Sequence, residues 1–189
     1  MRLFVAVTPP SAALTELGRA AQQLHALPHA DRLRWTDPAT WHFTLVFLGE
    51  VGEELLPELD ERLGRAARRH PPHEVRLAGG GRFGDRTLWA GAEGELETLR
   101  ALARSAGAAA RRSGVAVDES RPFHAHLTLA RATGRARVNL RPFADALAGF
   151  TGTPWRVGRL ELVRSHLPGS GQPGERPRYE GVRAWDLGH

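Results

Sequence analysis

The sequence contains no cysteine and no lysine, since all 26 basic residues are arginine. The absence of cysteine excludes disulfides, thiol nucleophiles and thiolate metal ligands. The absence of lysine excludes a lysyl-nucleotide adduct and a Schiff base, so a bound phosphate must contact arginine, histidine, hydroxyl or backbone N–H groups. No apolar run approaches the roughly 20 residues of a membrane helix. The opening run of residues 1–7 is also shorter than the core of a signal peptide. We therefore expect a cytoplasmic protein with no membrane partner.

The remaining composition is typical of a globular protein, with 41% hydrophobic and 25% charged residues in a chain of 189. A chain of this length forms one domain or two small fused lobes. The net charge of +5 weakly favours a polyanionic partner such as RNA. A GC-rich genome is the simpler explanation for the exclusive use of arginine, so charge alone does not indicate function.

One short motif occurs twice. His42–Leu45 reads histidine, apolar, threonine, leucine, and His126–Leu129 repeats that order. Both copies lie in runs typical of strands, Trp41–Leu48 and Phe123–Ala130. Because alternate strand residues share a face, each histidine lies beside its threonine, about 6.6 Å apart along the strand. The apolar residues between them are expected to face a core.

The context of the motif repeats as well. The two copies are 126 − 42 = 84 residues apart, and the same shift lays Leu3–Val7 over Thr87–Gly91. Each half follows the plan strand, helix, strand, His/Thr strand, helix. We predict an α+β fold in which residues 1–189 form a single domain of two pseudo-symmetric lobes. Each lobe has a small antiparallel sheet with helices outside, and a central cleft lies between them.

Three local predictions complete the plan. Gly79–Gly81 is expected to form a hairpin turn, because no helix signal follows it and phosphate binding there is the weaker alternative. Val115–Val117 is expected to form a short strand. Residues 154–167 and 178–187 are expected to form a closing pair of strands.

Two histidines that converge from matched strands can carry out acid–base catalysis. The unperturbed pKa of histidine lies near neutrality, so one ring can act as acid while the other acts as base. A threonine hydroxyl beside each ring can donate to a nonbridging phosphate oxygen. Such a set suits in-line displacement at a phosphodiester without a metal or cofactor. The alternative is that both histidines are structural residues on a sheet.

These features resemble a known family. The paired His-x-Thr-Leu strands, the opening strand Arg2–Ala6 and the run Phe123–Arg131 resemble the two-histidine phosphoesterases over essentially the whole chain. Within them, the chain is most similar to the RNA 2′,3′-cyclic phosphodiesterases, also called 2′-5′ RNA ligases.

The resemblance implies an activity and a set of roles. A terminal RNA 2′,3′-cyclic phosphate would be hydrolysed to a 2′-phosphate. By position, His126 would deprotonate water and His42 would protonate the departing 3′ oxygen. Thr44 and Thr128 would hold the nonbridging oxygens, and Arg131 would stabilise charge. No cofactor, metal or obligatory protein partner is implied, and a monomer acting on RNA ends is expected.

Three of the candidate substrate-binding residues need separate arguments. Ideal alternation places Arg131 on the face opposite His126, so Arg131 needs a bulge, a twist or the end of the strand to reach a phosphate. His124 shares the face of His126 without a following threonine, so we interpret it as a supporting residue; metal ligation is the alternative. Phe83 is the favoured residue for stacking on a base.

Joining of RNA ends remains open. The chain has no lysine and no G-x-x-x-x-G-K-[ST] loop, so joining through a lysyl-adenylate or a phosphate-binding loop is excluded. Any 2′-5′ joining would be the reverse reaction, in which a 5′-hydroxyl attacks the cyclic phosphate without ATP. The alternatives are a non-catalytic RNA-binding module, or the same chemistry on a small cyclic nucleotide or ADP-ribose cyclic phosphate.

Overall fold

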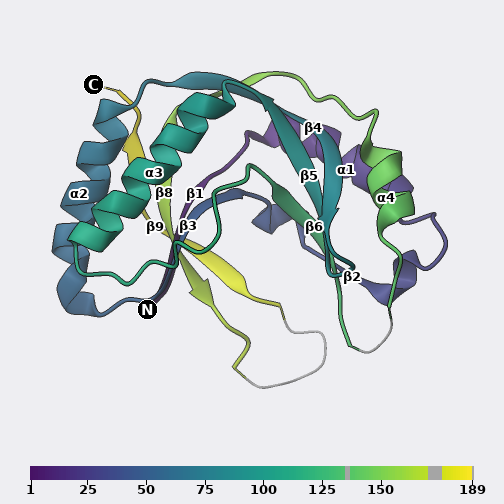
Figure 1. The fold of residues 1–189 in the computed structure, drawn as a ribbon, viewed down its shortest axis with the longest axis horizontal. Helices are drawn as coiled ribbons and strands as arrows, with labels where there is room; N and C mark the ends of the chain where they lie inside the picture. The colour runs from purple at the N-terminus through teal and green to yellow at the C-terminus, as the bar shows by residue number, and fades with distance from the viewer. Residues whose placement is uncertain (135–136, 170–175, 189) are drawn as a thin grey trace.

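The computed structural model describes residues 1–134, 137–169 and 176–188. Within these residues the chain forms two antiparallel sheets and four α-helices (Figure 1). The strands are β1 (Arg2–Val7), β2 (Leu33–Trp35), β3 (Phe43–Glu50), β4 (His73–Phe83), β5 (Thr87–Gly94), β6 (Leu127–Ala132), β7 (Trp155–Val157), β8 (Arg159–His166) and β9 (Arg178–Asp186). The helices are α1 (Ser11–Leu24), α2 (Leu56–Arg69), α3 (Leu96–Arg112) and α4 (Arg141–Leu147), with 3₁₀ turns η1 (Ala30–Arg32), η2 (Pro38–Thr40) and η3 (Glu53–Leu55).

The predicted α+β class is confirmed, with one His-x-Thr motif on each sheet. The first sheet has the strand order β3-β1-β8-β9, and the second has the order β2-β6-β5-β4-β7. β8 and β9 form the closing antiparallel pair that the sequence predicts. No helix of the described segments is long and apolar enough to cross a membrane.

The two halves of the sequence exchange their first helices. Helix α1 follows β1 but packs against β4 and α4 of the second lobe, and α3 follows β5 but packs against α2 and β3 of the first. Figure 1 shows α2 and α3 together on one side of the molecule and α1 with α4 on the other. Strand β2, from the first half, likewise pairs with β6 in the second sheet. Each lobe therefore depends on elements from both halves of the chain.

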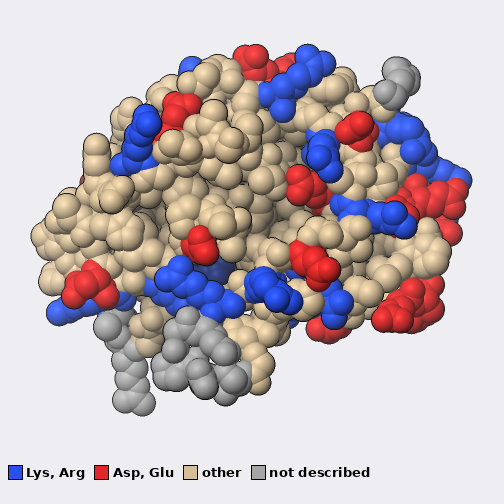
Figure 2. Space-filling view, turned by 180° about the vertical axis from the view of Figure 1, so that it is seen from behind, with Lys and Arg blue, Asp and Glu red and all other residues tan. Residues whose placement is uncertain are grey.

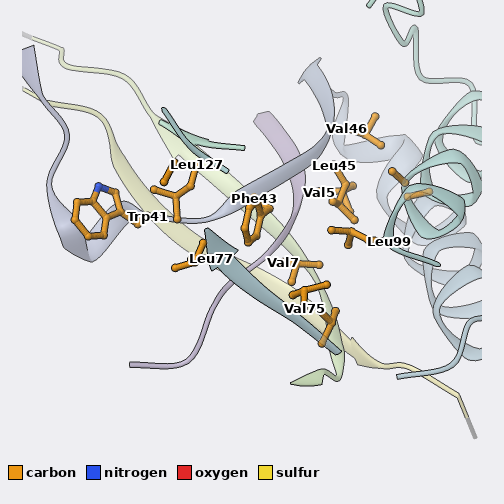
Figure 3. Close-up of a cluster of buried hydrophobic side chains, with 14 of the residues drawn as sticks. Val5, Val7, Trp41, Phe43, Leu45, Val46, Val75, Leu77, Leu99 and Leu127 are labelled. Atoms are coloured by element: carbon orange, nitrogen blue, oxygen red, sulfur yellow. The ribbon is translucent and has the colours of Figure 1, made fainter. Parts of the chain in front are cut away.

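One continuous hydrophobic core joins the lobes. Phe43 and Leu127, the apolar residues inside the two motifs, are both fully buried, as alternation along a strand predicts. Figure 3 shows Phe43 between Val7 of β1 and Leu77 of β4, so side chains of both sheets meet in this cluster. The motif histidines and threonines, which alternate with these residues, are consequently placed on the faces away from the core.

Both motif strands carry a bulge at the same place. The pairing of β3 with β1 skips Leu45, and the pairing of β6 with β5 skips Leu129. These leucines are 129 − 45 = 84 residues apart, the same spacing as the motif histidines. The bulged leucine and the residue after it are both buried, and the next side chain returns to the face of the threonine. The next side chain is Phe47 in β3 and Arg131 in β6.

Two local predictions are wrong. Gly79–Gly81 lies inside β4 rather than in a turn, and the chain reverses at residues 84–86 instead. Gly81 is needed because the ring of Trp89 crosses it, and a Cβ there would lie 2.4 Å from Trp89 Cζ2. A Cβ at Gly80 would lie 2.6 Å from Leu147 Cδ1, and Gly79 has a positive φ of 63°. Val115–Val117 forms no strand, since it pairs with neither sheet, and the N–H of Val115 instead bonds to a carbonyl at the end of α3.

Candidate active site

His42 is oriented by two hydrogen bonds. It lies between η2 and β3, one residue before the strand that the sequence predicts to include it. Its Nδ1 is 2.7 Å from the carbonyl oxygen of Thr40, which can only accept, so Nδ1 carries the proton. In the neutral ring Nε2 is then an acceptor, and the hydroxyl of Thr44 donates to it at 2.8 Å. The motif thus presents Nε2 as the nitrogen that can exchange a proton.

His126 is oriented in the same way in the other half. It also lies one residue before its strand, β6, and its Nδ1 is 2.7 Å from the carbonyl oxygen of His124. The carbonyl lies two residues before the histidine, as in the first motif. Nε2 is again the nitrogen available for proton transfer. Thr128 lies half-buried on the face of this strand away from the core.

The electrostatic environment links the two rings. Burial lowers the pKa of His42, the bond to the carbonyl of Thr40 opposes this, and repulsion from a charged His126 lowers the pKa further. Burial also lowers the pKa of His126, and repulsion from His124 and Arg131 adds to the effect. This repulsion agrees with the expectation that the two rings, 84 residues apart in the sequence, share one site.

Aromatic side chains surround the ring of His42. Phe4 stacks on it with centroids 4.7 Å apart and planes 24° apart, and Tyr179 contacts it edge-on at 5.4 Å. Phe47, which follows the bulge in β3, is 69% exposed and lies 6.4 Å from Phe4. Sequence reasoning does not single out Phe4, because it lies in an unbroken apolar run where residues of the two faces look alike.

A second aromatic group surrounds His126. Phe83 contacts the ring edge-on at 4.9 Å and is 43% exposed, so the favoured stacking residue lies beside the motif histidine. Trp89 lies 6.1 Å from His126 and 4.8 Å from His124. His124 itself is exposed and nearly parallel to His126, with centroids 5.8 Å apart and planes 18° apart. His124 thus lies at the rim beside the inner histidine.

The bulge in β6 resolves the expected difficulty with Arg131. Because Leu129 is the extra residue, Arg131 returns to the face of Thr128 and is exposed there. Its charge also contributes to the lowered pKa of His126, which places the guanidinium within electrostatic reach of that ring. Arg34 of β2 lies directly opposite Arg131 in the sheet. Two guanidinium groups at neighbouring positions favour an anionic ligand.

Within the described parts of the chain, no group of three or more histidine, cysteine, aspartate or glutamate side chains is arranged to hold a metal ion. The pair formed by His124 and His126 thus has no third ligand of these types among the described residues. The arrangement instead offers two imidazoles, two hydroxyls and an arginine, which suits proton transfer around an oxyanion.

A fold of two antiparallel sheets, each carrying a His-x-Thr pair, defines the chain as a two-histidine phosphoesterase. The LigT-like phosphoesterase family model matches the chain twice, at residues 7–89 and 90–171. The chain belongs to this family. Each match contains one motif, in agreement with the repeat seen in the sequence.

Individual relatives agree with this placement. The chain is 30% identical over 157 residues to an RNA 2′,3′-cyclic phosphodiesterase of Geobacillus stearothermophilus, covering 81% of this chain but only 47% of that protein. It is 32% identical over 187 residues to an RNA 2′,3′-cyclic phosphodiesterase of Escherichia coli, covering 98% of this chain and 96% of that protein. The crystal structure of E. coli LigT complexed with 3′-AMP matches with a TM-score of 0.73 at 26% identity, covering 98% of this chain and 96% of that one.

Proposed function

We propose that the protein hydrolyses RNA 2′,3′-cyclic phosphate ends to 2′-phosphates by paired histidine acid–base catalysis. The observation that carries the proposal is the matched orientation of the two rings. Each Nδ1 donates to a carbonyl two residues earlier, so both neutral rings present an unprotonated Nε2. The names of the relatives, and the 3′-AMP bound to E. coli LigT, support RNA ends as the substrate class.

The proposed reaction is an in-line displacement at phosphorus. Nε2 of neutral His126 takes a proton from water as the water oxygen attacks the cyclic phosphate. The bond between phosphorus and the 3′ oxygen breaks, and Nε2–H of protonated His42 transfers its proton to that oxygen. The 2′ oxygen stays bonded to phosphorus, which makes the product a 2′-phosphate. Water thus supplies one proton to His126, and the 3′-hydroxyl receives one from His42.

Three side chains would stabilise the charge that develops on the nonbridging oxygens. The hydroxyl of Thr44, already 2.8 Å from Nε2 of His42, can turn to donate to the phosphate. Thr128 occupies the matching position in the second motif, and Arg131 contributes a permanent positive charge. An anionic phosphate between the rings also favours protonated imidazole, which offsets the lowered pKa of His42.

The same groups would catalyse ATP-independent joining. A 5′-hydroxyl replaces water as the nucleophile, His126 takes its proton, and the product is a 2′-5′ phosphodiester. The number of phosphate ester bonds is unchanged, so the reaction is reversible and needs no energy input. The exposed ring of Phe83, 4.9 Å from His126, is suited to stack on a base that enters from the nucleophile side.

The test uses an oligonucleotide that ends in a 2′,3′-cyclic phosphate, incubated with the protein in EDTA. We expect conversion to a 2′-phosphate, identified by ³¹P NMR against 2′- and 3′-phosphate standards. A 3′-phosphate product, or a requirement for added metal, would contradict the mechanism. Salt-sensitive RNA binding without turnover would instead indicate a binding module. Figure 2 shows acidic groups interspersed among the arginines, so the visible face is not a continuous basic surface of the kind that such a module uses.

The size of the substrate is tested in parallel. A mononucleotide 2′,3′-cyclic phosphate and ADP-ribose cyclic phosphate would be offered at the same concentrations as the oligonucleotide. We expect the highest kcat/KM for RNA, because aromatic rings are exposed on both sides of the histidine pair. A preference for either small molecule would contradict RNA as the substrate and leave only the proposed reaction at phosphorus.

A further inference from the structure

A pocket of about 300 Å³ lies beside His124 on the second lobe. Strands β4 and β5, the first turns of α3 and the segment that precedes His126 form its walls. It is separate from the positions of the two catalytic histidines, because neither His42 nor His126 lines it. The lining residues are Ala78, Gly79, Gly80, Trp89, Gly91, Ala92, Glu93, Leu96, Arg100, Phe123, His124 and Ala125.

The pocket has flat apolar walls and two charged groups. The ring of Trp89, which lines the pocket, lies close over Gly81 of β4, since a Cβ there would be 2.4 Å from it. At Gly79 no atom lies within 4 Å of where a Cβ would be, so the strand leaves open space there. Glu93, which pairs with Arg76, and the half-buried Arg100, which pairs with Glu97, supply opposite charges. Aromatic and apolar walls with a few polar groups are typical of sites for small organic ligands such as nucleosides.

The position of the pocket relative to the histidines indicates which nucleoside it fits. In an in-line displacement the nucleophile and the leaving oxygen lie on opposite sides of phosphorus. His126 activates the nucleophile and His42 protonates the leaving oxygen, so the nucleophile enters from the His126 side. His124, 5.8 Å from His126 between ring centroids, lines the pocket and connects it to that side.

We propose that this pocket binds the terminal nucleoside of an RNA with a free 5′-hydroxyl, the acceptor in the joining reaction. The proposal rests on the proposed function, because it uses the same phosphorus centre. The 5′-oxygen forms the new bond to phosphorus, its proton passes to Nε2 of His126, and the bond to the 3′ oxygen breaks with a proton from His42. Arg100 exchanges its exposed ion pair with Glu97 for the first phosphate that follows the acceptor nucleoside, and the base lies against the apolar wall.

The test compares Arg100→Gln with Arg104→Gln. Arg104 is one turn further along α3, is exposed and does not line the pocket, so it is a matched control for loss of one positive charge. Joining of a cyclic-phosphate donor to a 5′-hydroxyl acceptor would be measured over a range of acceptor concentrations, with hydrolysis of the donor followed in the same reactions. For Arg100→Gln we expect KM for the acceptor to rise about tenfold and the ratio of joining to hydrolysis to fall by a similar factor, the scale of one charge-assisted hydrogen bond. Equal effects of the two substitutions would overturn the proposal.

A binding measurement separates failure of the pocket from failure of the reaction. The indole N–H of Trp89 is buried and has no hydrogen-bond partner within the described structure, so its NMR signal is a local reporter. Addition of a dinucleotide with a free 5′-hydroxyl should shift that signal in wild type and Arg104→Gln, and shift it less in Arg100→Gln at the same concentration. No shift in wild type would exclude the pocket even if the protein hydrolyses cyclic phosphates. A shift without any hydrolysis would support the pocket and exclude the proposed function.

Discussion

Replacement of Thr44 by valine is the sharpest test of the phosphate-binding hydroxyls. Valine has nearly the shape of threonine and keeps the β-branch that suits a strand, so the pairing of β3 with Ala6 of β1 is expected to persist. Thr44 is half-buried between the buried residues Phe43 and Leu45, and the change exposes no new cavity. The substitution therefore removes one hydroxyl and leaves the backbone in place.

The magnitude follows from the two contacts of that hydroxyl. In the resting protein it donates to Nε2 of His42 at 2.8 Å, a neutral bond that stabilises by about 1 kcal/mol. In the proposed transition state it donates to a nonbridging oxygen, and removal of such a donor costs about 3 kcal/mol, roughly a hundredfold to a thousandfold in kcat. We expect that loss for Thr44→Val, together with a change in the free energy of unfolding of less than about 1 kcal/mol.

The assay is kcat for hydrolysis of an oligonucleotide ending in a 2′,3′-cyclic phosphate, with urea unfolding of the same samples. Thr44→Ser is the matched control, because it keeps the hydroxyl and loses only a methyl group. It should retain most of the activity that valine loses. A folded Thr44→Val protein with more than about a third of the wild-type kcat would refute the assignment of this hydroxyl to the transition state.

Three other predictions test the histidines and the packing behind them. His42→Ala and His126→Ala should each lower kcat by roughly a hundredfold to ten-thousandfold, and the double variant should lose far less than the product of the two effects, because both rings act in one step. Burial lowers the pKa of both rings in the folded protein, so the unfolded chain binds more protons as the pH is lowered below about 6.5. The free energy of unfolding should therefore decrease as the pH is lowered through this range. Glutamine at both positions should weaken this pH dependence, measured by urea titrations at several pH values. Gly81→Ala should destabilise by about 1–3 kcal/mol, because its Cβ would lie 2.4 Å from Trp89, whereas Gly18→Ala, with open space around its Cβ, should stabilise helix α1 by about 0.5–1 kcal/mol in thermal unfolding.

The residues of the candidate site could be predicted because their signal is local. Histidine, apolar residue and threonine in strand-like runs place the two polar side chains on one face, and the second copy at a matched position makes chance coincidence improbable. Phe43 and Leu127 face the core for the same reason. The class of fold follows from this alternation and from the order of the elements.

The features that could not be predicted depend on tertiary contacts. The bulge at Leu129 is a property of the pairing of β6 with β5, and it determines which face Arg131 occupies. Gly79–Gly81 resembles a turn in the sequence, but Leu147 and the ring of Trp89 leave no room for a side chain at Gly80 and Gly81 within the strand. The exchange of α1 and α3 between the lobes could not be predicted from the sequence either, because both helices are amphipathic and either sheet could cover their apolar faces.

The matched bulges also explain how two similar motifs can take different roles. Each bulge returns one side chain to the face of the motif threonine, and that residue is Phe47 in the first half and Arg131 in the second. Burial lowers the pKa of both histidines, but only His126 also lies near a permanent positive charge. The other charge acting on His42 is that of His126, which vanishes when His126 is neutral. A neutral His126 beside Arg131 is therefore suited to be the base, and it leaves His42 free to hold a proton once an anionic phosphate binds. In the proposed mechanism, this difference between the two bulges favours His126 as the base and His42 as the acid.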